Sequence, residues 1–356
     1  MSRKVGIWVG VAVVALLGIV LMYPMLTTYM KSRTLTVNTK QVEFYIKKKT
    51  SLEDLTKELK ALGIIDQEEN FLAVGNYKGL DENNIALGKY LIDPGSQYRT
   101  LLNGFTLNDA GNGNGEVEVE VTFTNCRDIY DLSGKVSKCI MVDSAKLVEK
   151  LKSEATLNKY DFTLAQLPAM FIPNTYQLFY DTDEEKFIAR MAEEFKLFWN
   201  DTRMQKLKEI GLKSPSQAVT LASIVYSEQN KNPGEWPIIA GLYLNRITQG
   251  IKLQSDPTFR FCWGKQLDGV ERLLNIHRDI DCPYNTYKIN GLPPGPICIP
   301  PPEVTEAVLN RKKHNYIFMM AQPNYSGMHD FTVDYADHER LAGIYQRWLS
   351  QEQAGR

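Results

Sequence analysis

The fold of the C-terminal half is decided by residues 214–259, which read SPSQAVTLASIVYSEQNKNPGEWPIIAGLYLNRITQGIKLQSDPTF. We expect a helix here, because Ser214 can cap it, Pro215 suits its first position and Gln217 completes a Ser-x-x-Gln box. Apolar residues then repeat at the spacing of one helix face, at Ala218, Leu221, Ala222 and Val225. Glu228 falls at the edge of that face, where the helix is ending. The stretch therefore predicts a core-facing helix that ends at a carboxylate.

Two effects at the position of Glu228 would raise the pKa of its carboxyl group. Partial burial disfavours the charged form, and so does the negative end of the helix dipole, so both raise the carboxyl pKa. A raised pKa suits a general acid that works near neutral pH. From position alone, a solvated glutamate in a fraying last turn is the more common case. The polar turn expected at 254–258 and the proline-stiffened segment 291–297 favour the first interpretation, because they can wall a cleft.

Composition excludes some functions. The chain has 356 residues with 41 basic and 42 acidic side chains, which argues against a dedicated nucleic-acid binder. This length allows about two or three domains. The five cysteines form no C-x-x-C motif and no histidine lies at zinc-ligand spacing, so we expect no metal site, and we expect no cofactor. Cys262 and Cys282 could close a disulfide loop, but free buried thiols are at least as consistent with the sequence.

The N-terminus predicts a membrane anchor. Residues 5–26 contain no charged side chain and are long enough to cross a bilayer. Because Arg3 and Lys4 precede them, residues 1–4 should be a cytoplasmic tail and the rest should be exported. A cleaved signal peptide is the alternative, but the apolar run is long and no small-x-small cleavage site follows it. We expect a single-pass protein of the inner (plasma) membrane, with a connector at 27–41 and its catalytic domain on the periplasmic (extracytoplasmic) side.

Two small modules should follow the connector. Residues 42–107 predict a strand, two helices and a second strand, with Ser51 capping the first helix. Shifting the sequence by 77 residues keeps apolar positions in phase and places Asp54 on Asp131, which suggests a related module at 117–155. Chance periodicity of amphipathic helices is the alternative. The glycine- and asparagine-rich segment 108–115 should be a flexible turn or linker.

Residues 156–356 predict a larger α+β domain. An aromatic segment surrounds Tyr176, and a helix boxed by Thr182 and Glu185 follows it. Short strands are expected at 316–320 and 329–332. The last helix should bury five residues: Leu341, Ile344, Tyr345, Trp348 and Leu349.

Several short motifs in this domain keep their order and spacing over roughly residues 170–340. The motifs are Pro173-x-Thr175-Tyr176, Ala222-Ser223-Ile224-Val225-x-x-Glu228, Leu244-Asn245-Arg246, Leu253-Gln254-x-Asp256-Pro257-Thr258, Tyr284-Asn285-Thr286-Tyr287, Gly291-Leu292-Pro293-Pro294-Gly295-Pro296-Ile297 and His329-x-Phe331. They resemble one known family, the endolytic murein transglycosylases, or YceG-like proteins. The segment 42–107 also resembles a LysM-like glycan-binding module, although more loosely.

The resemblance implies an α+β fold and a membrane-anchored enzyme that cuts inside nascent glycan strands. Such an enzyme cleaves between N-acetylmuramic acid and N-acetylglucosamine and leaves a 1,6-anhydromuramic end. Its catalytic glutamate maps onto Glu228. Two departures stand out: Tyr226 replaces a frequent second glutamate, and Asn174 replaces a frequent aspartate. Glycan strands are the expected partner, with peptidoglycan synthases as further candidates and no nucleic acid.

The remaining site residues are suggested by their chemical type. Arg246 could pair with Glu228, orient another carboxylate or contact peptide-stem carboxylates, and Asp256 is an acidic partner. The residues that could bind the acetamido groups or another part of the substrate are Asn245, Gln254, Tyr284, Asn285 and Tyr176. A hydrolytic muramidase with Asp256 as its second carboxylate and a non-catalytic wall-binding protein remain the alternatives.

Overall fold

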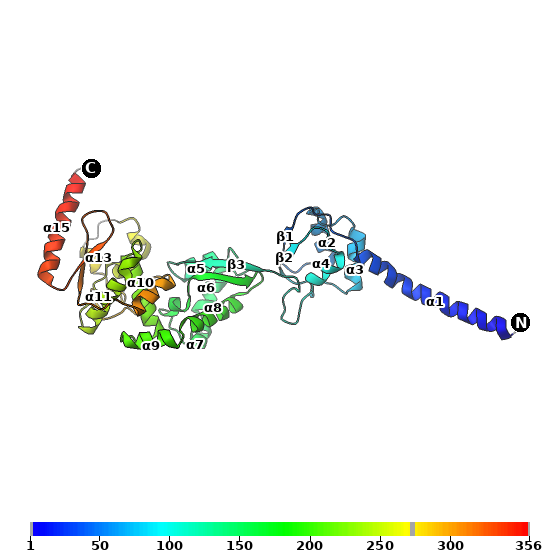
Figure 1. Ribbon diagram of the computed structural model, residues 1–356, viewed down its shortest axis with the longest axis horizontal. Helices are drawn as coiled ribbons and strands as arrows, with labels where there is room; N and C mark the ends of the chain where they lie inside the picture. The colour runs from blue at the N-terminus through cyan, green and yellow to red at the C-terminus, as the bar shows by residue number, and fades with distance from the viewer. Residues whose placement is uncertain (1–2, 271–274, 355–356) are drawn as a thin grey trace. The chain divides into compact units, whose positions relative to one another are not determined.

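The computed structural model describes residues 3–270 and 275–354, and within them it leaves out the side chains of residues 3–7, 9–12, 14, 15, 19, 275 and 353. The chain divides into two compact units (Figure 1). The first runs up to Val121 and includes 139–141 and 177–182. The second holds 122–138, 142–176 and the chain from Asp183 onward.

A long helix, α1 (Arg3–Ser32), opens the first unit. Several of its described apolar side chains are strongly exposed, with Leu21 at 75% and Met22 at 69%. Among the described residues, no helix combines the length and the apolar character that crossing a membrane requires. The span predicted for residues 5–26 includes residues 5–7, 9–12, 14, 15 and 19, whose side chains lie outside the described part.

The first module has the predicted order of strand, helix, helix and strand. β1 pairs antiparallel with β2, with Val42 opposite Ile92, and the two helices cover this ribbon. Its core includes Leu55, Leu59 and Phe71, which are fully buried. A further short helix, α4, was not predicted. The elements are β1 (Val42–Ile46), α2 (Leu52–Ala61), α3 (Glu68–Tyr77), β2 (Gly88–Ile92) and α4 (Tyr98–Gly104).

The second module repeats the first at a spacing of 77 residues. Ser51 caps α2 by accepting from the Asp54 backbone N–H at 3.1 Å, and Asp128 caps α5 by accepting from the Asp131 N–H at 2.8 Å. Two inserted helices delay the closing strand β4, which pairs with β3. These strands have residues in both units. The elements are β3 (Glu118–Phe123), α5 (Ile129–Val136), α6 (Ser144–Lys152), α7 (Glu154–Tyr160), η1 (Leu167–Met170) and β4 (Asn174–Phe179).

The segment between the modules forms a hydrogen-bonded loop within the first unit. The Asn108 side chain accepts from the backbone N–H groups of Ala110 at 2.9 Å and Asn112 at 3.1 Å, and Leu107 bridges to Gly113. Of the two alternatives expected here, a turn or a linker, the segment forms a turn, and the Asn108 side chain satisfies backbone groups within it.

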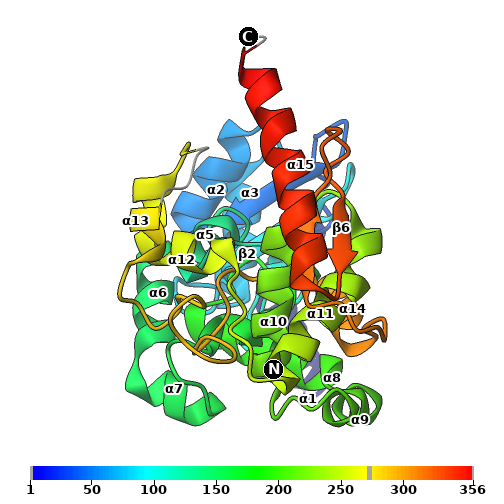
Figure 2. The same ribbon diagram turned by 90° about the vertical axis from the view of Figure 1, so that its left-hand side faces the viewer.

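The rest of the second unit is built around α10. Its residues from Ala218 to Val225 are all buried, and the neighbouring helices α11 and α14 pack beside it (Figure 2). The elements from Asp183 onward are α8 (Glu184–Phe198), α9 (Asp201–Glu209), α10 (Pro215–Glu228), η2 (Pro233–Glu235), α11 (Trp236–Thr248), α12 (Asp256–Trp263), η3 (Gly264–Leu267), α13 (Asn275–Arg278), α14 (Pro302–Leu309), β5 (Phe318–Ala321), β6 (His329–Thr332) and α15 (Tyr335–Ala354).

Some local expectations hold and others need correction. Ser214 caps α10 by accepting from the Gln217 N–H at 3.3 Å, as predicted. The cap of α8 is Asp183, which accepts from the Lys186 N–H at 2.8 Å, so the predicted Thr182 box is wrong. The turn expected at 254–258 instead starts α12, because a proline is well suited to a first helical turn.

The last helix is less buried than its apolar pattern predicts. Ile344 is 36% exposed and Leu349 is 39% exposed, and none of the five residues expected in its core is fully buried. α15 lies beside the β5–β6 hairpin and touches little else (Figure 2). A two-stranded hairpin is too narrow to cover a whole helix face.

Candidate active site

Glu228 is the last residue of α10, and its carboxyl group is held by hydroxyls from two other elements. The Tyr243 hydroxyl, on α11, donates to Glu228 Oε1 at 2.7 Å. The Ser255 hydroxyl, just before α12, donates to the same oxygen at 2.5 Å. No hydrogen bond to Oε2 is present among the described residues. Since both donors converge on Oε1, the proton of a neutral Glu228 belongs on Oε2, where it can be given to a substrate.

Burial raises the pKa of Glu228, and the nearby charge of Asp256 raises it further. The hydrogen bonds from Ser255 and Tyr243 act in the opposite direction, as does a charged His329. Glu228 itself is only partly buried as a residue, so its carboxyl group is desolvated without being sealed. This balance favours the neutral acid and still stabilises the carboxylate that remains after proton transfer.

Two of the predicted motifs, at residues 253–258 and 284–287, contact each other next to Ser255. The Thr286 hydroxyl accepts from the Ser255 backbone N–H at 2.9 Å and lies 2.8 Å from the Thr258 hydroxyl. All three residues are fully buried. The Tyr-Asn-Thr-Tyr segment thus fixes the start of α12, and with it the hydroxyl that binds Glu228.

Asp256 lies beside this start, with its carboxylate already engaged. Its Oδ1 accepts from the Tyr287 hydroxyl at 2.5 Å, and Arg278 Nη2 lies 3.7 Å from its Oδ2. Asp256 therefore acts on Glu228 through its charge, while a tyrosine and a guanidinium hold it in place.

Arg246 and Gln254 bind one another rather than Glu228. Arg246 donates to the Leu253 carbonyl at 2.8 Å and to Gln254 Oε1 at 2.9 Å. Gln254 has a positive φ of 51°, a conformation that a non-glycine residue adopts only when its surroundings hold it. The guanidinium thus braces the strained turn that leads into Ser255.

Two predicted substrate contacts serve backbone groups instead. Asn245 Nδ2 donates to the carbonyls of His314 at 2.8 Å and Tyr316 at 3.0 Å. Asn285 is fully buried and donates to the Arg278 carbonyl at 2.7 Å. The structure thus assigns these two amides to positioning of loops.

The two predicted tyrosines lie in different settings. Tyr176 is 3% exposed, and its hydroxyl donates to the Ile172 carbonyl, so it is not brought together with Glu228. Tyr284 is partly exposed, and its ring centroid lies 4.6 Å from that of Phe261 on α12. Only the second presents a ring that a substrate can reach.

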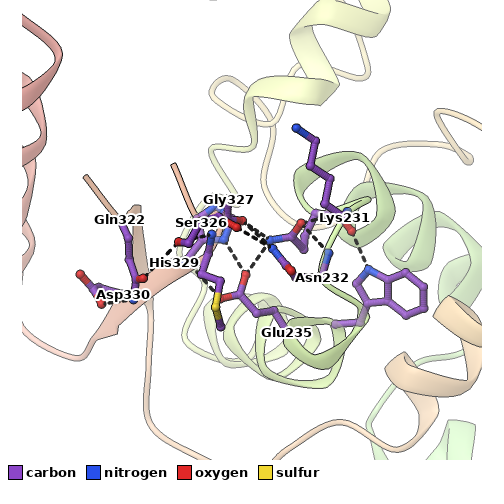
Figure 3. A network of polar contacts seen from close by, with 11 residues as sticks. Lys231, Asn232, Glu235, Gln322, Ser326, Gly327, His329 and Asp330 are labelled. Atoms are coloured by element: carbon purple, nitrogen blue, oxygen red, sulfur yellow. Dashed lines mark hydrogen bonds and ion pairs between the residues drawn. The ribbon is translucent and has the colours of Figure 1, made fainter. Parts of the chain in front are cut away.

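The residues just after Glu228 belong to a polar network in which the Gln229 and Glu235 side chains are buried (Figure 3). The Gln229 amide donates to Glu235 Oε2 at 2.7 Å and to the Gly327 carbonyl at 2.7 Å. Glu235 Oε1 accepts from the His329 backbone N–H at 2.8 Å, and its Oε2 lies 2.8 Å from His329 Nδ1. A carboxylate only accepts, so Nδ1 carries the proton.

This network joins the end of α10 to the β5–β6 hairpin. Asn232 adds bonds to the carbonyls of Gly327 at 3.1 Å and Ser326 at 3.3 Å, and Trp236 donates to the Gln229 carbonyl at 2.6 Å (Figure 3). His329 Nε2 makes no hydrogen bond among the described residues. The hairpin and the carboxyl-bearing helix are therefore fixed relative to each other.

Sequence reasoning did not single out Tyr243, Ser255 or Glu235. Tyr243 lies in an apolar run and Ser255 between two motif residues, so neither carries a signal of its own. Glu235 is 3% exposed, which is rare for a glutamate. Its place in the sequence, directly after Pro233 and Gly234, gives no sign that it is buried.

Within the described residues, no group of three or more His, Cys, Asp or Glu side chains could hold a metal ion.

An α+β domain with one desolvated carboxyl group at the end of a buried helix defines a candidate acid–base site. A model of the YceG-like family matches residues 44–343, and the chain belongs to this family. The family expected from the motifs is thus confirmed.

Two relatives are named endolytic murein transglycosylase. The one from Bacillus subtilis (strain 168) is 25% identical over 311 residues, which covers 83% of this chain and 82% of that protein. The one from Streptococcus pneumoniae (strain ATCC BAA-255 / R6) is 24% identical over 316 residues, which covers 83% of this chain but 49% of that protein.

A solved structure is also similar. The crystal structure of a yceG-like protein from Listeria monocytogenes is 20% identical, with a TM-score of 0.52 over 85% of this chain and 99% of that chain. At this identity the likeness concerns the fold alone, and it agrees with the mixed α+β class.

Proposed function

We propose that this protein is an endolytic peptidoglycan lytic transglycosylase in which Glu228 acts first as acid and then as base. The observation that carries the proposal is the carboxyl group of Glu228, whose pKa is raised by burial and whose Oε2 accepts no hydrogen bond from the described residues. The names of the relatives support the same activity. Cleavage within nascent strands, between N-acetylmuramic acid and N-acetylglucosamine, is the specific reaction we infer.

In the first step Glu228 gives its proton to the glycosidic oxygen, and the bond between that oxygen and C1 of the muramic residue breaks. The hydroxyls of Tyr243 and Ser255 stabilise the carboxylate that forms, because they already donate to Oε1. Asp256, held by Tyr287, is placed to offset the positive charge that develops on the sugar.

In the second step the 6-hydroxyl of the same muramic residue attacks C1. Its proton passes to the Glu228 carboxylate, which restores the acid, and a 1,6-anhydro ring is formed without water. One carboxyl group therefore completes the cycle. We infer that His329, held by Glu235, stabilises the Glu228 carboxylate between the two steps through its charge.

The test is digestion of purified glycan strands by wild type and by Glu228→Gln, with products resolved by mass spectrometry. Wild type should leave anhydromuramic ends, and the variant should be at least about a thousandfold slower, because it lacks the proton donor. Intact glycan with folded wild type would point to a non-catalytic wall-binding protein. Full activity of Glu228→Gln would reject the site.

The same digestion separates the muramidase alternative. A hydrolase leaves a reducing end that is one water heavier than an anhydro end. Asp256 would then have to act on water, but its Oδ1 already accepts from Tyr287 at 2.5 Å and its Oδ2 lies 3.7 Å from Arg278 Nη2. We therefore favour the transglycosylase.

We also propose that residues 5–26 anchor the protein in the plasma membrane and that 42–107 is a LysM-like glycan-binding module. The uncharged sequence and the exposed apolar side chains of α1 support the anchor. The order of strand, helix, helix and strand supports the module. An anchor would hold the site where strands are made, so membrane-bound synthases are the expected partners. Release of the protein by salt or carbonate, without detergent, would reject the anchor.

A further inference from the structure

A hollow in the second unit is not used by the mechanism above. It has a volume of about 210 Å³ and is lined by residues that include Arg127, Tyr130, Lys152, Phe261, Tyr284 and Cys298. This is below the roughly 300–1,000 Å³ of sites for drug-sized ligands, so it suits one sugar residue rather than a whole substrate. The second module contributes α5 and the end of α6 to its wall.

Two aromatic rings form a fixed platform in this hollow. The rings of Phe261 and Tyr284 lie 4.6 Å apart, and Phe261 is 38% exposed. The disulfide between Cys262 and Cys282 joins the two segments that carry them. A third ring, Tyr130, is 56% exposed. Rings that are packed against each other and still partly exposed present an apolar face of the kind on which sugar rings stack.

Two cations stand at the edge of the platform. Lys152 Nζ donates to the Tyr130 hydroxyl at 3.4 Å and lies 6.0 Å from the centre of its ring. Arg127 Nε lies 3.3 Å from Asp128 Oδ2, and its other guanidinium nitrogens make no hydrogen bond with a residue that the structure describes. These groups can meet a carboxylate carried by the bound sugar.

The hollow is close to Glu228. The Cys298 thiol lies 3.9 Å from the hydroxyl of Ser227, the residue before Glu228. Phe261 follows Ser255 by six residues along α12, and six residues of a helix rise by roughly 9 Å. A glycan strand that reaches Glu228 needs only a short extension to reach the platform.

We propose that this hollow is a saccharide subsite in which a neighbouring muramic residue stacks on Phe261 and Tyr284 and directs its carboxylate toward Lys152 and Arg127. The proposal rests on the proposed function and adds a role for the second module. The carboxylate is either the lactyl group of peptide-free glycan or a free carboxylate further along a peptide stem, and both offer the same chemistry to the cations.

The test compares Phe261→Ala and Lys152→Met in the full chain, with exposed residues of α8 and α9 as controls, Leu197→Ala and Lys208→Met. On peptide-free glycan strands both site variants should raise KM, Phe261→Ala by about tenfold, with kcat nearly unchanged. Calorimetry in a Glu228→Gln background uses chitotetraose, which has no carboxylate. Phe261→Ala should weaken this binding and Lys152→Met should not.

Phe261→Trp guards against loss of folding, because it keeps an aromatic face and should retain affinity. The subsite is wrong if folded Phe261→Ala binds chitotetraose as tightly as the Leu197→Ala control. If Lys152→Met leaves KM on glycan strands unchanged, the role of the carboxylate is wrong. Absence of anhydro products from wild type would reject the proposed function, while the calorimetry still reports on the subsite. Measuring the effect of Lys152→Met on KM with strands that carry peptide stems shows which carboxylate the cations bind.

Discussion

The hydroxyl of Tyr243 donates to Oε1 of Glu228 at 2.7 Å, across the contact between α10 and α11. This bond stabilises the charged form of the carboxyl group, in opposition to burial, which raises its pKa. A residue that must be acid and base in turn needs both influences.

Tyr243→Phe should therefore raise the pKa of Glu228 further. We expect the alkaline limb of the kcat/KM profile, where the neutral acid is lost, to move up by about one pH unit. The measurement is kcat/KM on glycan strands between pH 5 and 10. Tyr226→Phe is the control, because the Tyr226 hydroxyl accepts from Asn125 at 3.2 Å and does not touch Glu228. A downward shift would contradict the assignment.

Glu235→Gln should separate positioning from folding. Glutamine keeps the shape of Glu235 but not its charge, so it holds the His329 imidazole less firmly, and a charged His329 is one of the groups that lower the pKa of Glu228. We expect kcat to fall about tenfold, with little change in KM, and the alkaline limb to move up. Asp330→Asn is the control. Asp330 lies next to His329 on β6, but its carboxylate accepts from the Gln322 side chain at 2.8 Å. Equal losses in both variants would indicate a purely structural role.

Glu116 predicts a pH-dependent stability in the first unit. Burial, and then the charge of Asp181, raise its pKa to about 7, and Asn112 lies within 3.3 Å of both carboxylates. A folded-state pKa above the unfolded value gives stability that is present at low pH and lost as pH rises through about 7.

We expect the wild type to lose about 1–2 kcal/mol of unfolding free energy between pH 4.5 and 8, a figure reduced for partial exposure. Glu116→Gln should lack this loss, whereas Glu118→Gln, an exposed position on β3, should keep it. Urea titrations at both pH values measure it. Parallel curves for wild type and Glu116→Gln would show that the carboxyl group does not titrate as proposed.

Gly241→Ala should strain the support of the hairpin. A Cβ at Gly241, in the middle of α11, would lie 2.4 Å from the Lys312 carbonyl oxygen and 2.7 Å from His314 Nε2. We expect a loss of about 1–3 kcal/mol in unfolding free energy. Gly134→Ala in α5 meets nothing within 4 Å and should instead gain about 0.5–1 kcal/mol. Similar stabilities for the two variants would contradict the close packing.

Local features of the site were predictable from sequence. Ser214, Pro215 and the apolar spacing located α10, and the position of Glu228 at its end followed from counting residues. The repeat of 77 residues likewise preserved the cap positions Ser51 and Asp128, because capping depends on the next three residues alone.

The partners of Glu228 were not predictable, because they depend on tertiary contacts. Tyr243 and Ser255 reach the carboxyl group only after α10, α11 and the start of α12 have packed. For the same reason Asn245 looked like a substrate ligand, although its amide is taken by carbonyls of a loop about 70 residues away, at His314 and Tyr316. Residue type indicates what a side chain can bond, and packing decides what it does bond.

Glu228 and Gln229 are adjacent in the chain. Glu228 carries the proton donor, and the side chain of Gln229 donates a hydrogen bond to the Gly327 carbonyl of the hairpin. The proton donor is therefore one peptide unit away from a residue that the hairpin holds. A displacement of the hairpin would therefore act on the backbone one planar peptide unit from Glu228. We expect a ligand that binds residues 326–329 to change the position of the acid.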